Sequence, residues 1–162
     1  MLKLGMEHKK FTFDREMPPV ASIKPGESVL FETEDANVSL ITKETDIWAE
    51  FPKLYAMGGG CNPVTGPVYV EGATNKDCLK VEIKKVVPGF IRNGGYTSIY
   101  SGLGSLQNVQ GSLQKPLEPR TKICGFEDGN IIFKLHESDE FLKVPMNPFV
   151  GTIGVAPKED RR

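Results

Sequence analysis

The sequence has little histidine and little cysteine. Its 162 residues include two histidines and three cysteines. Two histidines are too few for a His-rich zinc site built from this chain alone. Cys61, Cys78 and Cys124 form no Cys-x-x-Cys motif and cannot all pair, so we expect reduced thiols. Cys61 follows a glycine run, but no histidine lies near it in sequence to activate a nucleophile.

Long apolar runs and an excess of one charge are also absent. No uninterrupted apolar run approaches the roughly 20 residues that a membrane span needs. The 20 Lys and Arg against 21 Asp and Glu leave a net charge of -1, which lacks the electrostatic character of a nucleic-acid binder. Residues 1–10 are too polar for a signal peptide. We therefore expect a cytoplasmic protein that binds neither nucleic acid nor membrane.

The histidines do not suggest a catalytic triad. The sequence has no Gly-x-Ser-x-Gly motif. His8 lies in a polar N-terminal tail and His136 in a charged stretch. We expect both to be solvated rather than catalytic.

Glycine and proline, in contrast, are plentiful: the 17 glycines and 12 prolines are spread along the chain, as is typical of turns between many short elements. The clearest predicted strand covers 78–86, where Leu79, Val81 and Ile83 alternate with charged residues. Further short strands are predicted at 11–13, 28–33, 68–70, 121–126, 130–135 and 149–155.

Turn and helix signals complete the fold prediction. Pro25-Gly26 and Glu127-Asp128-Gly129-Asn130 have turn chemistry. One helix is predicted near 44–56, broken by Pro52. The sequence thus predicts a mainly β, barrel- or sandwich-like domain of short strands with at most one or two short helices. We expect a single domain over 1–157 and a charged C-terminal tail at 158–162.

One candidate site is an acidic segment at a strand end. Residues 31–37 place Glu32, Glu34 and Asp35 close together in sequence. If the strand ends at Thr33, the following turn brings Glu32 and Asp35 together. Converging carboxylates bind a cation or act as a general base. The alternative is a solvated acidic loop.

A second candidate is the glycine- and proline-rich stretch at 58–67. Exposed N–H groups in such a stretch bind an anion or a carbonyl oxygen; the alternative is an ordinary loop. A third stretch, 144–157, carries no charge and predicts a buried strand with close backbone approach.

Three blocks together resemble the acetamidase/formamidase family. They are Asn-Pro-Val-Thr-Gly-Pro at 62–67, Leu-Lys-Val-Glu-Ile at 79–83 and Gly-Thr-Ile-Gly-Val-Ala-Pro at 151–157, in the family's order. The early turn Pro25-Gly26 and the acidic segment after it also fit. The resemblance covers residues 8 to 157.

The resemblance implies a mainly β hydrolase that converts formamide or acetamide to the carboxylic acid and ammonia, assisted by a divalent metal, zinc or calcium. It implies Glu32 and Asp35 as catalytic and metal-binding residues. Asn62 and Thr65 would position the substrate.

The sequence departs from the family in length. Members are usually about twice as long and continue after Val-Ala-Pro into a His-Gly-Gly-Asn-Met-Asp-like segment, where this sequence has residues 158–162. We therefore expect the N-terminal half of an amidohydrolase, in a half-length or split form. The alternative is a non-catalytic β-domain subunit or small-molecule binding module of the same ancestry. In either case we expect a homo-oligomer or a complementary C-terminal-half chain, because a half-fold exposes an apolar face.

Overall fold

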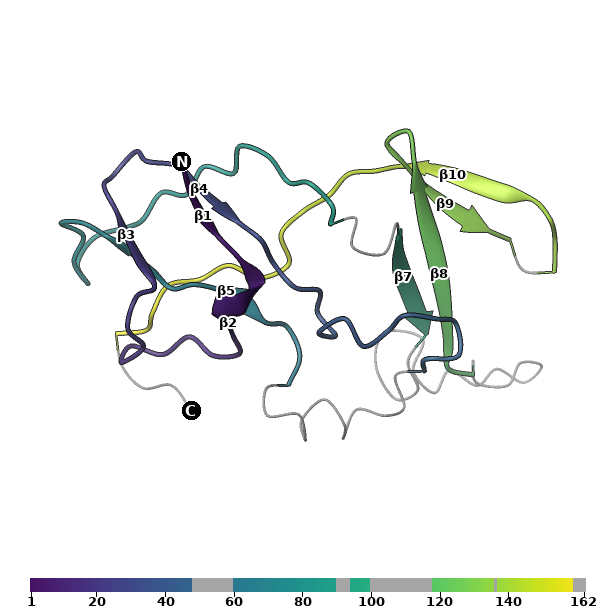
Figure 1. Cartoon of the computed structure of the whole chain (residues 1–162), viewed down its shortest axis with the longest axis horizontal. Coiled ribbons are helices and arrows are strands. Elements are labelled where there is room, and N and C mark those ends of the chain that lie inside the picture. The colour runs from purple at the N-terminus through teal and green to yellow at the C-terminus, as the bar shows by residue number, and fades with distance from the viewer. Residues whose placement is uncertain (48–59, 90–93, 100–117, 136, 159–162) are drawn as a thin grey trace, which may run out of the picture. The chain divides into compact units, whose positions relative to one another are not determined.

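A computed structural model describes residues 1–47, 60–89, 94–99, 118–135 and 137–158 (Figure 1). These residues fall into two compact units, and each is described by itself. The described residues of Met1–Ser39, Leu54–Lys85 and Val150–Arg162 belong to unit 1, and those of Leu40–Lys53 and Val86–Phe149 belong to unit 2. The single domain predicted for 1–157 stays a prediction.

Unit 1 consists of short strands paired two by two. β1 (Leu2–Leu4) runs parallel to β4 (Val29–Phe31), and β3 (Ala21–Ile23) runs parallel to β6 (Val68–Val70). β2 (Lys9–Lys10) is antiparallel to β5 (Val64–Thr65), with Lys9 opposite Thr65. The 3-10 helix η1 (Met6–His8) lies between β1 and β2. The N-terminal residues therefore form ordered strands, which corrects the prediction of a polar tail around His8.

Unit 2 is one antiparallel sheet in the order β10-β9-β8-β7. Its strands are β7 (Gly94–Ile99), β8 (Arg120–Glu127), β9 (Asn130–Lys134) and β10 (Phe141–Pro145). The hairpin between β8 and β9 confirms the predicted strands and turn. Asp128 and Gly129 both have positive φ, 47° and 74°, as a two-residue hairpin turn requires.

The predicted turn at Pro25-Gly26 is confirmed. Gly26 has a φ of 88°, and Glu27 N–H donates to the Lys24 carbonyl at 3.1 Å. Proline followed by glycine at positive φ is the signature of a type II turn. The turn leads directly into β4, the confirmed part of the strand predicted for 28–33.

Three predicted strands are wrong. Residues 78–86 and 149–155 contain no strand, and 11–13 lie just after β2. In each case the apolar pattern is present, but no neighbouring backbone forms a ladder with it among the described residues. The uncharged stretch at 144–157 is exposed rather than buried, with Phe149 83% exposed. The close approach predicted there does occur, since a Cβ atom on Gly154 would come within 3.0 Å of the Phe13 ring.

Other predictions fall partly outside the described residues. Glu44 and Thr45 form a turn rather than the start of a helix, and the rest of the predicted helix, including Pro52, lies mostly in 48–59. Gly58, Gly59, His136 and residues 159–162 of the predicted tail also lie outside.

The mainly β class is confirmed. η1 is the only helix among the described residues, and the sheets there are open rather than closed into barrels. Six strands were not predicted: β1, β2, β3, β5, β7 and β10. Within the same residues, no helix has the length and apolar character to cross a membrane.

The hydrophobic core of the described residues is small. Leu4, Ile41 and Cys124 are its buried hydrophobic side chains. Thr121 is buried too, and its hydroxyl donates to the Asp46 carbonyl at 2.6 Å, which ties the segment before residue 48 to β8. Many large apolar side chains of the described residues remain exposed.

Candidate functional site

The acidic segment begins where β4 ends. Glu32 N–H continues the strand pairing by donating to the Leu4 carbonyl at 2.8 Å. The Glu32 carboxylate lies 2.8 Å from Lys3 Nζ, and both side chains are substantially exposed. The hydrogen bond from Lys3 to Glu32 and the attraction between their charges raise the pKa of Lys3. Glu32 therefore neighbours a cation at the surface.

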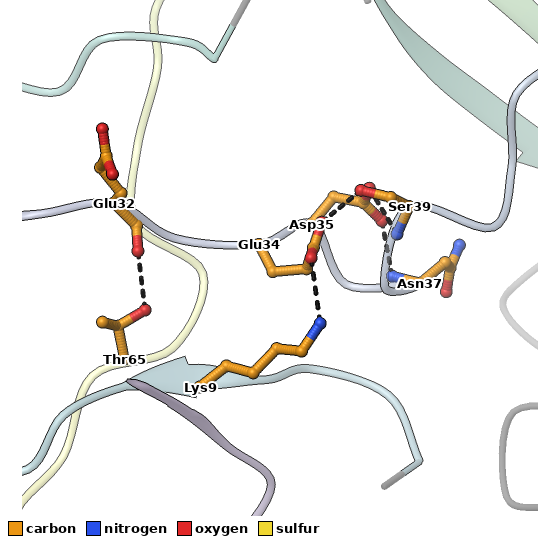
Figure 2. A network of polar contacts seen from close by, with 7 residues as sticks. All are labelled: Lys9, Glu32, Glu34, Asp35, Asn37, Ser39 and Thr65. Atoms are coloured by element: carbon orange, nitrogen blue, oxygen red, sulfur yellow. Dashed lines mark hydrogen bonds and ion pairs between the residues drawn. The ribbon is translucent and has the colours of Figure 1, made fainter. Parts of the chain in front are cut away.

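Asp35 holds the turn that follows. Its Oδ1 accepts a hydrogen bond from Asn37 N–H at 2.7 Å, and its Oδ2 accepts one from Ser39 N–H at 3.0 Å (Figure 2). Val38 and Ser39 have positive φ values of 53° and 59°. A β-branched valine in this region is strained. The Asp35 carboxylate thus stabilises a turn conformation that the sequence alone would disfavour.

Glu34 is a largely buried member of the site, for which the sequence predicted no role. Its side chain is 12% exposed, lies 3.2 Å from Lys9 Nζ and accepts a hydrogen bond from the Ser39 hydroxyl. Ser39 therefore links Glu34 with Asp35 (Figure 2). The acidic run was visible in the sequence, but Lys9 belongs to β2, a strand whose pairing the sequence did not predict.

The Asn-Pro-Val-Thr-Gly-Pro block packs directly against the acidic segment. The Thr65 hydroxyl donates to the Glu32 carbonyl at 2.8 Å (Figure 2), and Asn62 N–H donates to the Ala36 carbonyl at 2.8 Å. Asn62 has a φ of 58°, which asparagine tolerates better than most residues. Two segments about thirty residues apart in sequence are thus joined by one side-chain and one backbone hydrogen bond, both to carbonyls of the acidic segment.

The carboxylates of Glu32 and Asp35 do not converge. Figure 2 shows the Glu32 carboxylate pointing away from the turn that Asp35 stabilises. Each carboxylate has its own partners, Lys3 in one case and two backbone amides in the other. The catalytic and metal-binding roles predicted for these residues stay predictions.

The described residues do not by themselves fit a metal ion. A zinc or calcium site needs several protein ligands around one point. Within residues 1–47, 60–89, 94–99, 118–135 and 137–158, no three Asp, Glu, His or Cys side chains form such a group.

The fold and site define a mainly β protein in which an acidic turn and a proline- and glycine-rich segment are joined. The sequence profile of the acetamidase/formamidase family matches residues 5–161. The chain therefore belongs to the acetamidase/formamidase family. No curated protein matches it.

Three solved structures are similar over nearly the whole chain. The acetamidase from Bacillus halodurans has 34% identity and a TM-score of 0.76, and the match covers 96% of this chain and 46% of that one. A protein described as a predicted acetamidase/formamidase from Thermoanaerobacter tengcongensis has 36% identity, a TM-score of 0.74, and coverages of 98% and 46%. The acetamidase from Yersinia enterocolitica has 25% identity, a TM-score of 0.76, and coverages of 98% and 47%. The chain thus spans about half the length of these relatives.

Proposed function

We propose that this chain supplies one half of an amidohydrolase that converts formamide or acetamide and water to the carboxylic acid and ammonia. The observation that carries the proposal is the family match over residues 5–161, together with two relatives at 34% and 36% identity whose descriptions name acetamidase. The half-length form is supported by the coverage of 46% of each of those relatives.

The reaction sets clear requirements for the site. Water attacks the amide carbonyl carbon, the C–N bond breaks, and a proton moves from the attacking water to the leaving nitrogen. A positioned carboxylate is a suitable general base for that proton. We assign this role to Glu32; Asp35 lies further along the same segment, with its carboxylate held by other partners.

The geometry of Glu32 is compatible with such a role. Its partnership with Lys3 is an exposed ion pair, and exposed pairs are weak because water screens both charges. Exchange of Lys3 for a substrate or a water molecule therefore costs little. Asp35 differs, because both of its oxygens are held by backbone amides.

Asn62 and Thr65 complete the proposed site as substrate-positioning residues. Thr65 Oγ1 lies 2.8 Å from the Glu32 backbone carbonyl, so the hydroxyl is fixed against the backbone that carries the proposed base. The Asn62 side chain is exposed, with Nδ2 3.4 Å from Cys61 Sγ. An exposed amide has both a donor and an acceptor to offer to a small amide.

We also propose that the site uses a divalent metal, zinc or calcium. Glu32 and Asp35 would be two of its ligands, and other residues would supply the rest. We also propose that the complete site forms in an assembly, with a second copy or a complementary C-terminal-half chain, and that it works in the cytoplasm. The absence of a three-ligand group among the described residues favours completion from outside them.

A second candidate is a non-catalytic β-domain subunit or small-molecule binding module of the same ancestry. The observation in its favour is that the described carboxylates of Glu32 and Asp35 have separate partners instead of converging. Such a module would bind a small amide without hydrolysing it.

The test is ammonia release from formamide and acetamide, measured with and without added zinc. Two samples are compared: the purified chain, and a chimera in which residues 1–162 replace the matching part of the Bacillus halodurans acetamidase. Ammonia from the chimera that falls with Glu32→Gln supports the proposal. If the folded chain and the folded chimera both bind amide but release no ammonia, the result supports the non-catalytic module.

A further inference from the structure

Residues 78–86 have the sequence of a strand but form none. Leu79, Val81 and Ile83 are 51%, 54% and 57% exposed, and charged residues alternate with them. In Figure 1 this segment follows β6 as a trace without an arrow. Alternation of this kind is the pattern of a strand with one face buried, yet here that face meets solvent.

The backbone of the segment is also available. Among the described residues, no backbone hydrogen bond joins 78–86 to another segment. Its polar face contacts another part of unit 1, the residue before β4, since Lys84 Nζ donates to Ser28 Oγ at 2.8 Å. A strand with unpaired backbone groups and an exposed apolar face is a template for pairing with another strand.

A second apolar stretch of unit 1 is exposed as well. Val150, Ile153 and Val155 are 41%, 61% and 64% exposed and lie in an uncharged part of the sequence. Large exposed apolar surfaces mark sites of association. Unit 1 leaves large apolar side chains exposed in two stretches, 79–83 and 150–155.

The solved relatives are much longer than the part that matches this chain. They match 96–98% of this chain, yet the match covers only 46–47% of their own chains. More than half of each relative therefore has no counterpart in these 162 residues. The unmatched part of each relative is therefore our candidate for the partner that covers the apolar side chains of 78–86.

We propose that residues 78–86 become a β-strand by pairing with the part of an acetamidase fold that has no counterpart here. Leu79, Val81 and Ile83 then face that part, and Lys80, Glu82 and Lys84 stay toward water. Backbone hydrogen bonds supply the affinity, and the alternate apolar side chains fix the register. The inference rests on the proposed function in one respect, that this chain supplies half of the family's fold.

Hydrogen–deuterium exchange tests this, in the purified chain and in the Bacillus halodurans chimera. We expect amides of 79–85 to exchange at close to the unstructured rate in the chain alone. In the chimera, the paired amides should exchange at least about 100-fold more slowly. Leu79→Ser with Val81→Ser should abolish this protection, whereas the matched control Lys80→Ser with Glu82→Ser should retain it.

Three results would overturn the inference. One is protection already present in the monomeric chain. Another is protection that rises with concentration together with a dimer, which would make a second copy the partner. The third is fast exchange of 79–85 in a folded chimera or, if the chimera does not fold, of the matching segment in the intact Bacillus enzyme. Exchange is measured without substrate, so a protected but inactive chimera would contradict the proposed function and leave this inference standing.

Discussion

The Thr65 hydroxyl donates a hydrogen bond to the backbone carbonyl of Glu32 at 2.8 Å. This bond joins the Asn-Pro-Val-Thr-Gly-Pro block to the acidic segment. Because the bond is made to the backbone of Glu32, Thr65 fixes the path of the chain and leaves the carboxylate free to change partner. The proposed base is thus carried on a fixed backbone.

Thr65→Val should test this bond directly. Valine keeps the shape of threonine but cannot donate, so the folded state should lose about 0.5–1.5 kcal/mol. Urea unfolding measures the loss. Thr33→Val is the matched control, since Thr33 is exposed in the same segment and should change stability much less. Equal losses in the two variants would show that the Thr65 bond contributes nothing specific.

Asp35→Ala should destabilise the chain through the turn. The variant removes the acceptors of Asn37 N–H and Ser39 N–H, and Asn37 is 3% exposed. A loss of about 1–2 kcal/mol is expected in urea unfolding. Asp14→Ala is the control, because the Asp14 carboxylate accepts a single hydrogen bond, from Glu16 N–H, at an exposed position.

Asp35→Asn separates the structural role of Asp35 from its proposed chemical role, since it preserves size and removes charge. We expect it to lower both the zinc content and the ammonia release of the chimera. The free energy of unfolding should fall less than in Asp35→Ala. Unchanged metal content together with unchanged activity would remove Asp35 from the proposed site.

Stability should fall in acid partly because of Asp46 and Asp77. Hydrogen bonds from Thr42 lower the pKa of Asp46, and those from Thr74 lower the pKa of Asp77, both from an ordinary value of 3.8. A carboxylate whose pKa is lower in the folded state stabilises the fold above its unfolded pKa, and this contribution disappears as the pH falls through the folded value.

The variants Asp46→Asn and Asp77→Asn should therefore be less stable than the wild type at pH 7, and the difference should shrink as the pH falls below 3.8. Thermal unfolding between pH 2 and 7 measures this. A difference that is constant across the range would contradict the assignment.

The cysteines should differ strongly in reactivity. Cys124 is 6% exposed, and burial raises the pKa of its thiol, whereas Cys78 is exposed. Since the thiolate is the reactive form, native Cys124 should react with a thiol reagent at pH 8 on the order of 100-fold more slowly than Cys78. Cys78→Ser should remove the fast phase, and similar rates for both thiols would contradict the buried position of Cys124.

Local chemistry explains which parts of the fold were predictable. The β8–β9 hairpin was predictable because Asp128 and Gly129 favour the turn that sets its register. Residues 78–86 were not, because an alternating pattern identifies a face but says nothing of the strand that must pair with it. β7 was missed because it begins with Gly94 and Gly95, which have low strand propensity.

In the site, too, features set by local sequence were predictable and features set by tertiary contacts were not. The acidic segment was recognisable from residue type, and the structure places Thr65 and Asn62 beside it. The separate partners of Glu32 and Asp35 were not predictable, because Lys3 reaches Glu32 only through the β1–β4 pairing. Burial of Glu34 against Lys9 likewise depends on tertiary contacts.

The most direct test of the central claim is ammonia release from acetamide and formamide by the Bacillus halodurans chimera that carries residues 1–162. The claim that this chain supplies half of an amidohydrolase predicts ammonia from at least one amide, and its loss in Glu32→Gln. A folded chimera that binds amide but releases no ammonia would contradict the claim and assign this chain to a non-catalytic role.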